Sequence, residues 1–209
     1  GNDSADYTNA PGAVIVNLGA TNLIFGATTV VGGTARDGTG GIDTLQSIEG
    51  ALGSAFADTL VGGIASETFT GRGGNDSLVG GAGMDTVDYS ESAAGVIVNL
   101  GATSLIVGSD TVTAGSARDG AAGTDRLSQF EVVLGSNFAD SVTGAGDTIV
   151  GAGSTAMALF GNAGHDRLVS GTVNDVLDGG AGNDTLISGA GNDTLEGFTV
   201  LKGAEVDIK

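Results

Sequence analysis

The sequence predicts an all-β fold, a solenoid in which very short strands alternate with glycine-rich turns. Three observations predict it: a nine-residue phrase that recurs along the chain, a longer duplication spaced by 82 residues, and a composition of 40 Gly with a formal net charge of −18. So much glycine can indicate disorder, but a hydrophobic share of 40% with aliphatic residues at regular places favours a periodic structure.

The longer repeat aligns residues 6–63 with residues 88–145 without a gap, and 31 of the 58 positions are identical. Because this identity is spread along the whole alignment, we interpret it as a duplication. The segment VIVNLGAT occurs at 14–21 and again at 96–103, and its alternation predicts strands that widen or cap the solenoid. Residues 1–3 align with the middle of a nine-residue phrase, so we expect the sequence to be a fragment.

The nine-residue phrase is clearest in GGAGNDTLI at 179–187 and SGAGNDTLE at 188–196. Four consecutive phrases cover 161–196, four more cover 53–88, and isolated copies lie at 38–46, 120–128 and 135–143. Position six is acidic and position eight is apolar in every phrase. Small, turn-forming residues followed by three extended ones predict one turn and one strand per phrase, and two phrases per coil. The apolar residues expected in the core are Leu78, Val87, Leu168, Leu177, Leu186 and Leu195.

Stacking of the coils places the acidic residue of one phrase beside that of the phrase two further along. Carboxylates so close together repel each other, and glycine turns expose main-chain carbonyl oxygens beside them. Oxygen-only, anionic sites are those that a hard cation such as Ca²⁺ prefers. The sequence therefore predicts several bound Ca²⁺ ions whose binding is coupled to folding.

The phrases resemble the GGxGxDxUx nonapeptide of the RTX (repeats-in-toxin, hemolysin-type) calcium-binding family, and GGAGNDTLI matches every defined position. The joining blocks, of the type VDYS…GVIVNL…DRL, resemble connecting segments of large RTX surface proteins. The resemblance implies an all-β, right-handed parallel β-roll (β-solenoid) with calcium in the glycine-rich turns. It also implies type I secretion and folding outside the cell.

By this resemblance, the calcium ligands are the position-six carboxylates together with main-chain carbonyls of the turns. The implied pairs are Asp166 with Asp184, Asp175 with Asp193, Asp58 with Asp76, and Glu67 with Asp85. The isolated phrases add Asp43, Asp125 and Asp140, for which a turn contact with the backbone is an alternative of equal weight. The sites of Asp58 and Asp175 lack a glycine at position four, and Glu67 is a methylene longer than Asp, so we expect these sites to be weaker.

The remaining polar residues carry structural expectations. Arg36 and Arg118, each followed by Asp, recur in the duplication and indicate a local ion pair or turn contact. Glu49 and Glu131 also recur; each either supports a turn, which we favour, or lends a calcium ligand. His165 is the only histidine and is expected to be an exposed turn residue. Since the carboxylates repeat regularly and no catalytic constellation stands out, we predict that the chain is not an enzyme.

We expect three segments: a first repeat unit at 1–88 with an RTX block at 53–88, a second unit at 89–160, and a terminal RTX block with a capping strand at 161–209. The predicted function is that of a calcium-binding β-roll region in a secreted, extracellular bacterial surface protein, an S-layer subunit or adhesin. The alternative is the non-catalytic RTX region of a type I-secreted enzyme or toxin, such as a protease, lipase, epimerase or cytolysin. Besides calcium, the predicted partners are further copies of the chain or a cell-surface polysaccharide. The acidic charge argues against nucleic acid, and the lack of a long apolar run argues against membrane insertion.

Overall fold

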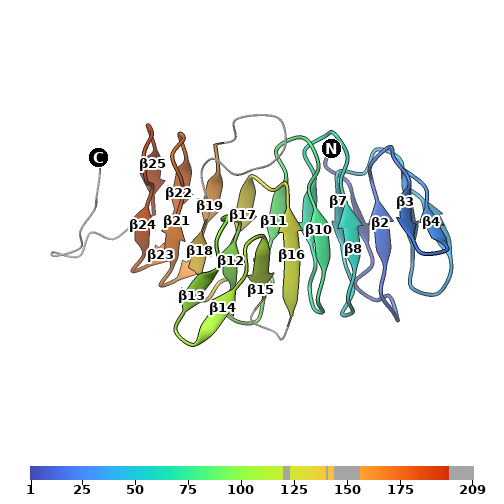
Figure 1. The fold of residues 1–209 in the computed structure, drawn as a ribbon, viewed down its shortest axis with the longest axis horizontal. Helices are drawn as coiled ribbons and strands as arrows, with labels where there is room; N and C mark the ends of the chain where they lie inside the picture. The colour runs from blue at the N-terminus through green and yellow to red at the C-terminus, as the bar shows by residue number, and fades with distance from the viewer. Residues whose placement is uncertain (120–122, 140, 144–155, 198–209) are drawn as a thin grey trace. The chain divides into compact units, whose positions relative to one another are not determined.

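The computed structural model describes residues 1–119, 123–139, 141–143 and 156–197, the third of these ranges by its backbone. All regular elements in these ranges are β-strands, most of them three residues long (Figure 1). This confirms the all-β class. Within the same ranges there is no helix long and apolar enough to span a membrane. The chain divides into two compact units: unit 1 comprises Gly1–Asp88 and Ala122–Phe130, and unit 2 comprises Tyr89–Ala121 and Glu131–Lys209.

Unit 1 contains a parallel sheet with the order β1-β7-β9-β11 and a second sheet with the order β16-β10-β8-β2-β5-β6. The second sheet is parallel from β16 to β2 and antiparallel from β2 to β6, and β3 pairs with β4 in a separate hairpin. The strands of unit 1 are β1 (Ser4–Asp6), β2 (Ile15–Asn17), β3 (Leu23–Phe25), β4 (Thr28–Val30), β5 (Thr34–Arg36), β6 (Ile42–Thr44), β7 (Gly50–Leu52), β8 (Thr59–Val61), β9 (Thr68–Thr70), β10 (Ser77–Val79), β11 (Thr86–Asp88) and β16 (Thr124–Ser128).

Position eight of the phrases faces the interior of unit 1. Leu60, Leu78 and Leu127 lie in register on β8, β10 and β16, and all three are buried. On β9, the ring of Phe69 contacts Phe130 edge to face, with ring centroids 6.3 Å apart. A strand of three residues has too few contacts to be stable alone, so this column of side chains and the hydrogen bonds between coils hold the stack together.

Unit 2 contains a parallel sheet with the order β17-β19-β22-β25, and a sheet with the order β24-β21-β18-β12-β15 in which only β15 is antiparallel. Two small sheets pair β13 with β14 and β20 with β23. The strands of unit 2 are β12 (Ile97–Asn99), β13 (Leu105–Val107), β14 (Asp110–Val112), β15 (Ser116–Arg118), β17 (Val132–Leu134), β18 (Ser141–Thr143), β19 (Ala158–Phe160), β20 (Ala163–Gly164), β21 (Arg167–Val169), β22 (Val176–Asp178), β23 (Ala181–Gly182), β24 (Thr185–Ile187) and β25 (Thr194–Glu196).

In unit 2, position eight of the phrases also faces the core, except in the last coil. Leu168 and Leu177 are fully buried, as predicted. Leu186 and Leu195 are only half-buried, which corrects the prediction that they are core residues. The physical reason is that, among the strands of the described residues, β24 and β25 are the terminal ones of their sheets, so each pairs on one side only. The predicted capping strand at 198–209 lies outside the described residues.

The repeated VIVNLGAT segments form a strand and then lead into a hairpin. In both copies a buried asparagine at the strand end holds the loop in place, a role that the sequence analysis missed. Asn17 Nδ2 donates to the carbonyl oxygens of Thr21 (2.8 Å) and Val30 (3.1 Å). Asn99 makes the corresponding bonds to Thr103 (2.9 Å) and Val112 (3.0 Å). Because a buried amide needs partners on all sides, an asparagine repeated inside an apolar strand was the available signal.

Candidate metal centre

The acidic residues of the repeats lie directly before the strands, where each turn joins its sheet. At one edge of unit 1, each main-chain N–H donates to the carboxylate of the next coil: Val14 N to Asp58 Oδ1 (2.8 Å), Asp58 N to Asp76 Oδ1 (2.8 Å), and Asp76 N to Asp125 Oδ1 (3.0 Å). The parallel pairing of β2, β8, β10 and β16 sets this spacing. We call these four residues the first ladder.

A second ladder in unit 1 precedes β1, β7, β9 and β11 and contains Asp3, Glu49, Glu67 and Asp85. Asp3 N donates to Glu49 Oε2 (3.0 Å), and Glu67 N donates to Asp85 Oδ1 (2.8 Å). Glu49 therefore has a structural contact in the stack, although it lies outside the nine-residue phrases. All four residues of this ladder are acidic.

In unit 2 the same contact joins the residues of the terminal block. Asp166 N donates to Asp184 Oδ1 and Asp175 N donates to Asp193 Oδ1, each over 3.0 Å. Together with the contacts of unit 1, the structure thus places side by side all four carboxylate pairs expected from stacking at a spacing of 18 residues. Met157 N donates to Asp175 Oδ1 (2.9 Å), so the residue that stacks before Asp175 is apolar. The predicted ligand Asp140 lies outside the described residues.

The glycine at position one of a phrase leaves room for the carboxylate at position six. A Cβ atom at Gly71 would lie 2.5 Å from Asp76 Oδ2, and one at Gly179 would lie 2.6 Å from Asp184 Oδ2. Each carboxylate therefore directs one oxygen to the N–H of the preceding coil and the other to its own glycine turn. Where glycine occupies position one, as at Gly71 and Gly179, this close approach is the reason rather than the backbone conformation, whereas Ser170 and Ser188 occupy the same position in two other phrases.

Burial makes the negative charge of these carboxylates costly. Six of the predicted ligands are at most 2% exposed: Asp58, Asp76, Asp85, Asp125, Asp166 and Asp175. Burial raises the pKa of Asp58 and of Asp85 above the ordinary value. Burial, together with the neighbouring Asp85 carboxylate, raises the pKa of Glu67 to about 7. Binding of a proton or a cation that neutralises these groups therefore stabilises the folded stack.

The carboxylate oxygens that are buried without a hydrogen-bond donor from the described residues include Glu67 Oε2 and Asp184 Oδ2. A buried anionic oxygen without a partner is strongly unfavourable, and each of these two belongs to a stacked carboxylate pair. Across the described ranges, no three His, Cys, Asp or Glu side chains converge on one point. A cation would therefore draw on paired carboxylates and main-chain oxygens, which is a donor set that fits hard Ca²⁺.

Protein donors satisfy both carboxylate oxygens of Asp58. Ser54 N donates to Asp58 Oδ2 (2.5 Å), the Ser54 hydroxyl donates to Oδ1 (2.9 Å), and Val14 N donates to Oδ1. From the sequence, this site is expected to be weak because position four of the phrase is not glycine. The structure shows two further features of the site, a serine at position two and a valine at the stacked position.

Asp43 is placed in different surroundings from the other predicted ligands. It is exposed, its strand β6 pairs antiparallel with β5, and its cross-strand neighbour is Ala35. Its Oδ2 accepts a hydrogen bond from the Tyr7 hydroxyl (2.9 Å). Burial and this carboxylate raise the pKa of Tyr7. The observed partner of Asp43 is thus a side chain 36 residues away, and not the backbone of its own turn.

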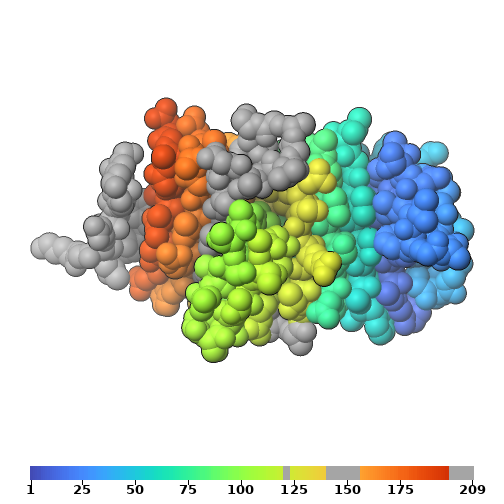
Figure 2. Space-filling model, viewed as in Figure 1, coloured from blue at the N-terminus to red at the C-terminus, as the bar shows by residue number. Residues whose placement is uncertain are grey.

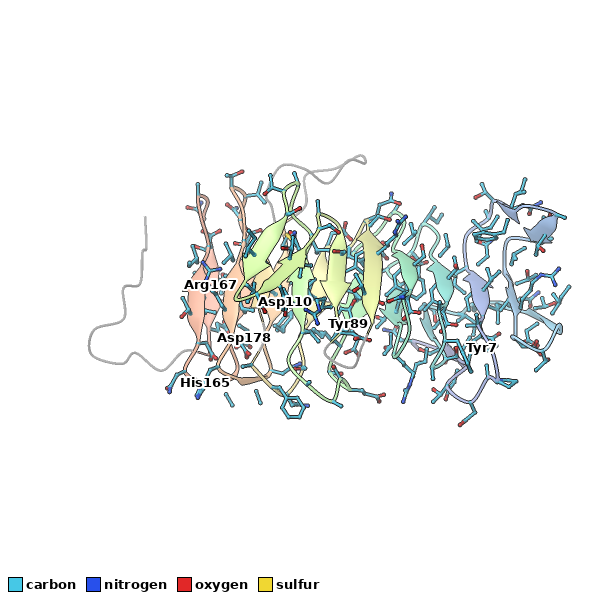
Figure 3. The ribbon with its side chains drawn as sticks, turned by 60° about the horizontal axis from the view of Figure 1, so that its bottom comes forward. Tyr7, Tyr89, Asp110, His165, Arg167 and Asp178 are labelled. Carbon is cyan, nitrogen blue, oxygen red and sulfur yellow. The ribbon has the colours of Figure 1, made fainter. Side chains whose placement is uncertain are left out.

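The residue at position five of the nine-residue phrase makes a further contact between coils, which was not predicted from the sequence. Its side chain accepts the N–H of the corresponding residue one coil along: Asn75 from Thr124 (2.8 Å), Asn174 from Asn192 (2.8 Å), and His165 Nδ1 from Asn183 (2.9 Å). His165 is exposed at a turn, as expected, and lies beyond the strand ends (Figure 3). The Asn-Asp dipeptide repeated in the phrases was the signal for this contact, because Asn is a good local acceptor.

The parallel sheets of stacked coils, the glycine turns and the buried carboxylate ladders define a β-roll of the cation-binding type. In a comparison with known families, residues 52–87 and 160–195 match the RTX calcium-binding nonapeptide repeat, described by four copies of the phrase. The chain therefore contains RTX calcium-binding repeats in a β-roll, which confirms the resemblance seen in its sequence. No curated protein matched the chain. Glu49, Asp125 and both hairpins lie outside the matched segments.

Proposed function

We propose that calcium binding drives the folding of this β-roll and that the chain is a non-enzymatic region of a secreted bacterial surface protein. The observation that carries the proposal is a set of stacked, buried carboxylates in a chain of net charge −18. Asp184 Oδ2 and Glu67 Oε2 are buried without a donor from the described residues, so a bound cation would supply the partner that these oxygens lack.

The residues that would hold calcium are the stacked pairs, foremost Asp166 with Asp184 and Glu67 with Asp85, together with carbonyl oxygens of their turns. When bound, calcium supplies the positive charge that these oxygens lack. The chain itself supplies the rest. The N–H of the preceding coil orients one carboxylate oxygen, and the glycine at position one leaves room for the other. Because the site exists only when two coils are stacked, binding free energy adds to folding free energy.

Secretion and a role at the cell surface, in an S-layer or as an adhesin, agree with this chemistry. Strands of three residues depend on neighbouring coils, so a chain without calcium can be exported unfolded, by type I secretion, and fold where calcium is plentiful. The 82-residue duplication favours a repetitive structural protein over the terminal region of an enzyme or toxin. A catalytic domain elsewhere in the same gene would contradict this part of the proposal.

Calcium titration followed by circular dichroism tests the coupled folding. We expect a weak β signal in chelator, a cooperative gain of β structure with calcium, and little response to magnesium, which requires tighter octahedral geometry. A spectrum in chelator identical to that in calcium would contradict the proposal.

A matched pair of variants tests the ligands. Asp184→Asn keeps an acceptor for Asp166 N but removes the charge, so the calcium midpoint should rise by about tenfold. Asp178→Asn makes the same chemical change at position nine of a phrase in the same block, where Asp178 Oδ1 accepts the N–H of the nearby Gly180 (3.0 Å). This control should titrate as the wild type does; equal shifts in both variants would argue against the ligand assignment.

A further inference from the structure

Each unit carries a hairpin with an isoleucine on its outer face. Ile24 of β3 is 74% exposed and pairs across the hairpin with Thr29; Ile106 of β13 is 73% exposed and pairs with Thr111. In the space-filling view, the β13–β14 hairpin bulges from the surface of unit 2, in green (Figure 2). We call these two Ile–Thr surfaces the hairpin faces.

The core of the roll does not explain these isoleucines. Side chains alternate along a strand, and it is Val30 and Val112, on the opposite side of each hairpin, that are buried (1% and 2% exposed). The duplication nevertheless has isoleucine and threonine at both outer positions, while the turns between them differ. At 74% and 73% exposure these isoleucines bury little area within the fold, and the same exposed Ile–Thr pair occurs in both hairpins.

The segments that carry the hairpin faces contain few charged residues for a strongly acidic protein. Residues 7–35 contain no charged side chain, and neither do residues 92–109. Asp110, at the start of β14, forms an ion pair with Arg118. Two chains of net charge −18 repel each other when their acidic turns approach, and this repulsion is smallest where charge is absent.

We propose that the hairpin faces are self-association surfaces whose partner is a second copy of this chain. A face that is apolar, uncharged and the same in both units is suited to pack against itself in a two-fold contact. A basic protein would be attracted to the acidic turns instead, and an anionic membrane would repel the chain. One hairpin is smaller than a stable interface needs, but two per chain act together, so weak contacts yield a stronger association.

Sedimentation velocity of the calcium-folded full chain, at concentrations up to about 1 mM, tests the inference. The wild type should associate as concentration rises, and added NaCl should strengthen the association because salt screens the repulsion between acidic turns. The double variant Ile24→Thr/Ile106→Thr keeps β-branched side chains but removes the apolar face, and should raise the apparent dissociation constant by about tenfold or more. The matched control is Ile64→Thr, since Ile64 is 91% exposed on a turn outside both hairpins; it should associate like the wild type.

The inference rests on the proposed function in one respect, because it concerns the calcium-folded chain. The outcomes distinguish a failure of the inference from a failure of the proposed function. Circular dichroism of each sample reports whether it has folded, and a chain that stays unfolded in calcium contradicts the proposed function. A folded wild type that remains monomeric, as it would if the partner were a foreign protein or a lipid surface, overturns the inference alone. So does a double variant that associates as strongly as the wild type. Should the double variant lose β structure, the single variants, each affecting one unit, must still weaken association and leave folding intact.

Discussion

Asp43 and Asp125 occupy corresponding positions of the 82-residue duplication, yet their surroundings within unit 1 are opposite. Asp125 is fully buried, lies on β16, which pairs in parallel with β10, and accepts the N–H of Asp76. Asp43 is exposed on an antiparallel strand and accepts the hydroxyl of Tyr7.

The nine-residue phrase alone is therefore not sufficient to place its acidic residue in a ladder. An acidic residue joins a ladder only where its strand pairs in parallel with a strand of the neighbouring coil, because this pairing aligns its carboxylate with the next N–H. Substitutions of Asp125 and Asp43 therefore distinguish the contribution of coil stacking to stability from that of the nine-residue phrase alone.

Removal of calcium should have the largest effect on the stability of the fold. The pH dependence of that stability in chelator should show that repulsion between stacked carboxylates is the cause. Folding raises the pKa of Glu67 from 4.5 to about 7 and raises that of Asp58 and Asp85. Between pH 4.5 and 7, the folded chain thus binds more protons than the unfolded chain, so its stability falls as pH rises through this window. In chelator, we expect the β signal of circular dichroism to be weak at pH 8 and stronger at pH 5.

The control for this pH effect is Glu67→Gln, which cannot titrate at that position and should show a smaller change between the two pH values. A chelated wild type with less β structure at pH 5 than at pH 8 would contradict the assignment of repulsion between stacked carboxylates as the destabilising force.

Overcrowding of the stack should have the next largest effect. In Gly62→Ala, the new methyl group would collide with the carbonyl oxygen of Gly80 in the neighbouring coil, and we expect a loss of about 3 kcal/mol in the free energy of unfolding. In Gly73→Ala, the nearest atom lies 3.9 Å away, so the stability should change by no more than about 1 kcal/mol. Urea unfolding in calcium measures both, and equal losses would show that close stacking is not the constraint.

The comparison itself is tested by Asp125→Ala and Asp43→Ala. Loss of the buried carboxylate leaves Asp76 N without its acceptor and should cost about 2 kcal/mol. Loss of the exposed carboxylate removes one hydrogen bond from Tyr7 and should cost less than about 1 kcal/mol. Calcium titration and urea unfolding of both variants measure the difference; a larger effect at Asp43 would reverse the conclusion drawn from stacking.

The smallest expected effect is at position five. His165→Ala removes the acceptor for Asn183 N at an exposed turn and should cost about 0.5–1 kcal/mol in urea unfolding. His165→Asn should recover the loss, because Asn174 makes the same contact elsewhere in unit 2. A loss that asparagine does not recover would mean that the imidazole has another role.

Local periodicity was sufficient to predict the all-β class, the buried leucines of the inner coils and the pairing of Asp166 with Asp184, because these depend on neighbours at a fixed spacing of 18 residues. It was not sufficient to predict that Asp125 stacks on Asp76, since 49 residues separate them. Nor did it reveal that Val14 occupies a ladder position, because the position is defined by strand pairing and not by residue type. Where the chain returns to the stack is a property of the tertiary fold.

The ladders also have a practical consequence, which follows from the lengths of chain between their members. Val14 and Asp58 are 44 residues apart and Asp76 and Asp125 are 49 apart, yet both pairs make the contact that Asp58 and Asp76 make across 18 residues. The contact thus depends on where the chain rejoins the stack, and it forms with very different numbers of residues between its two members. The entropic cost of closing a loop grows only slowly with the length of the loop. Gly26 and Gly108, with open space around them at the hairpin turns, are therefore suitable places to graft a foreign peptide for display.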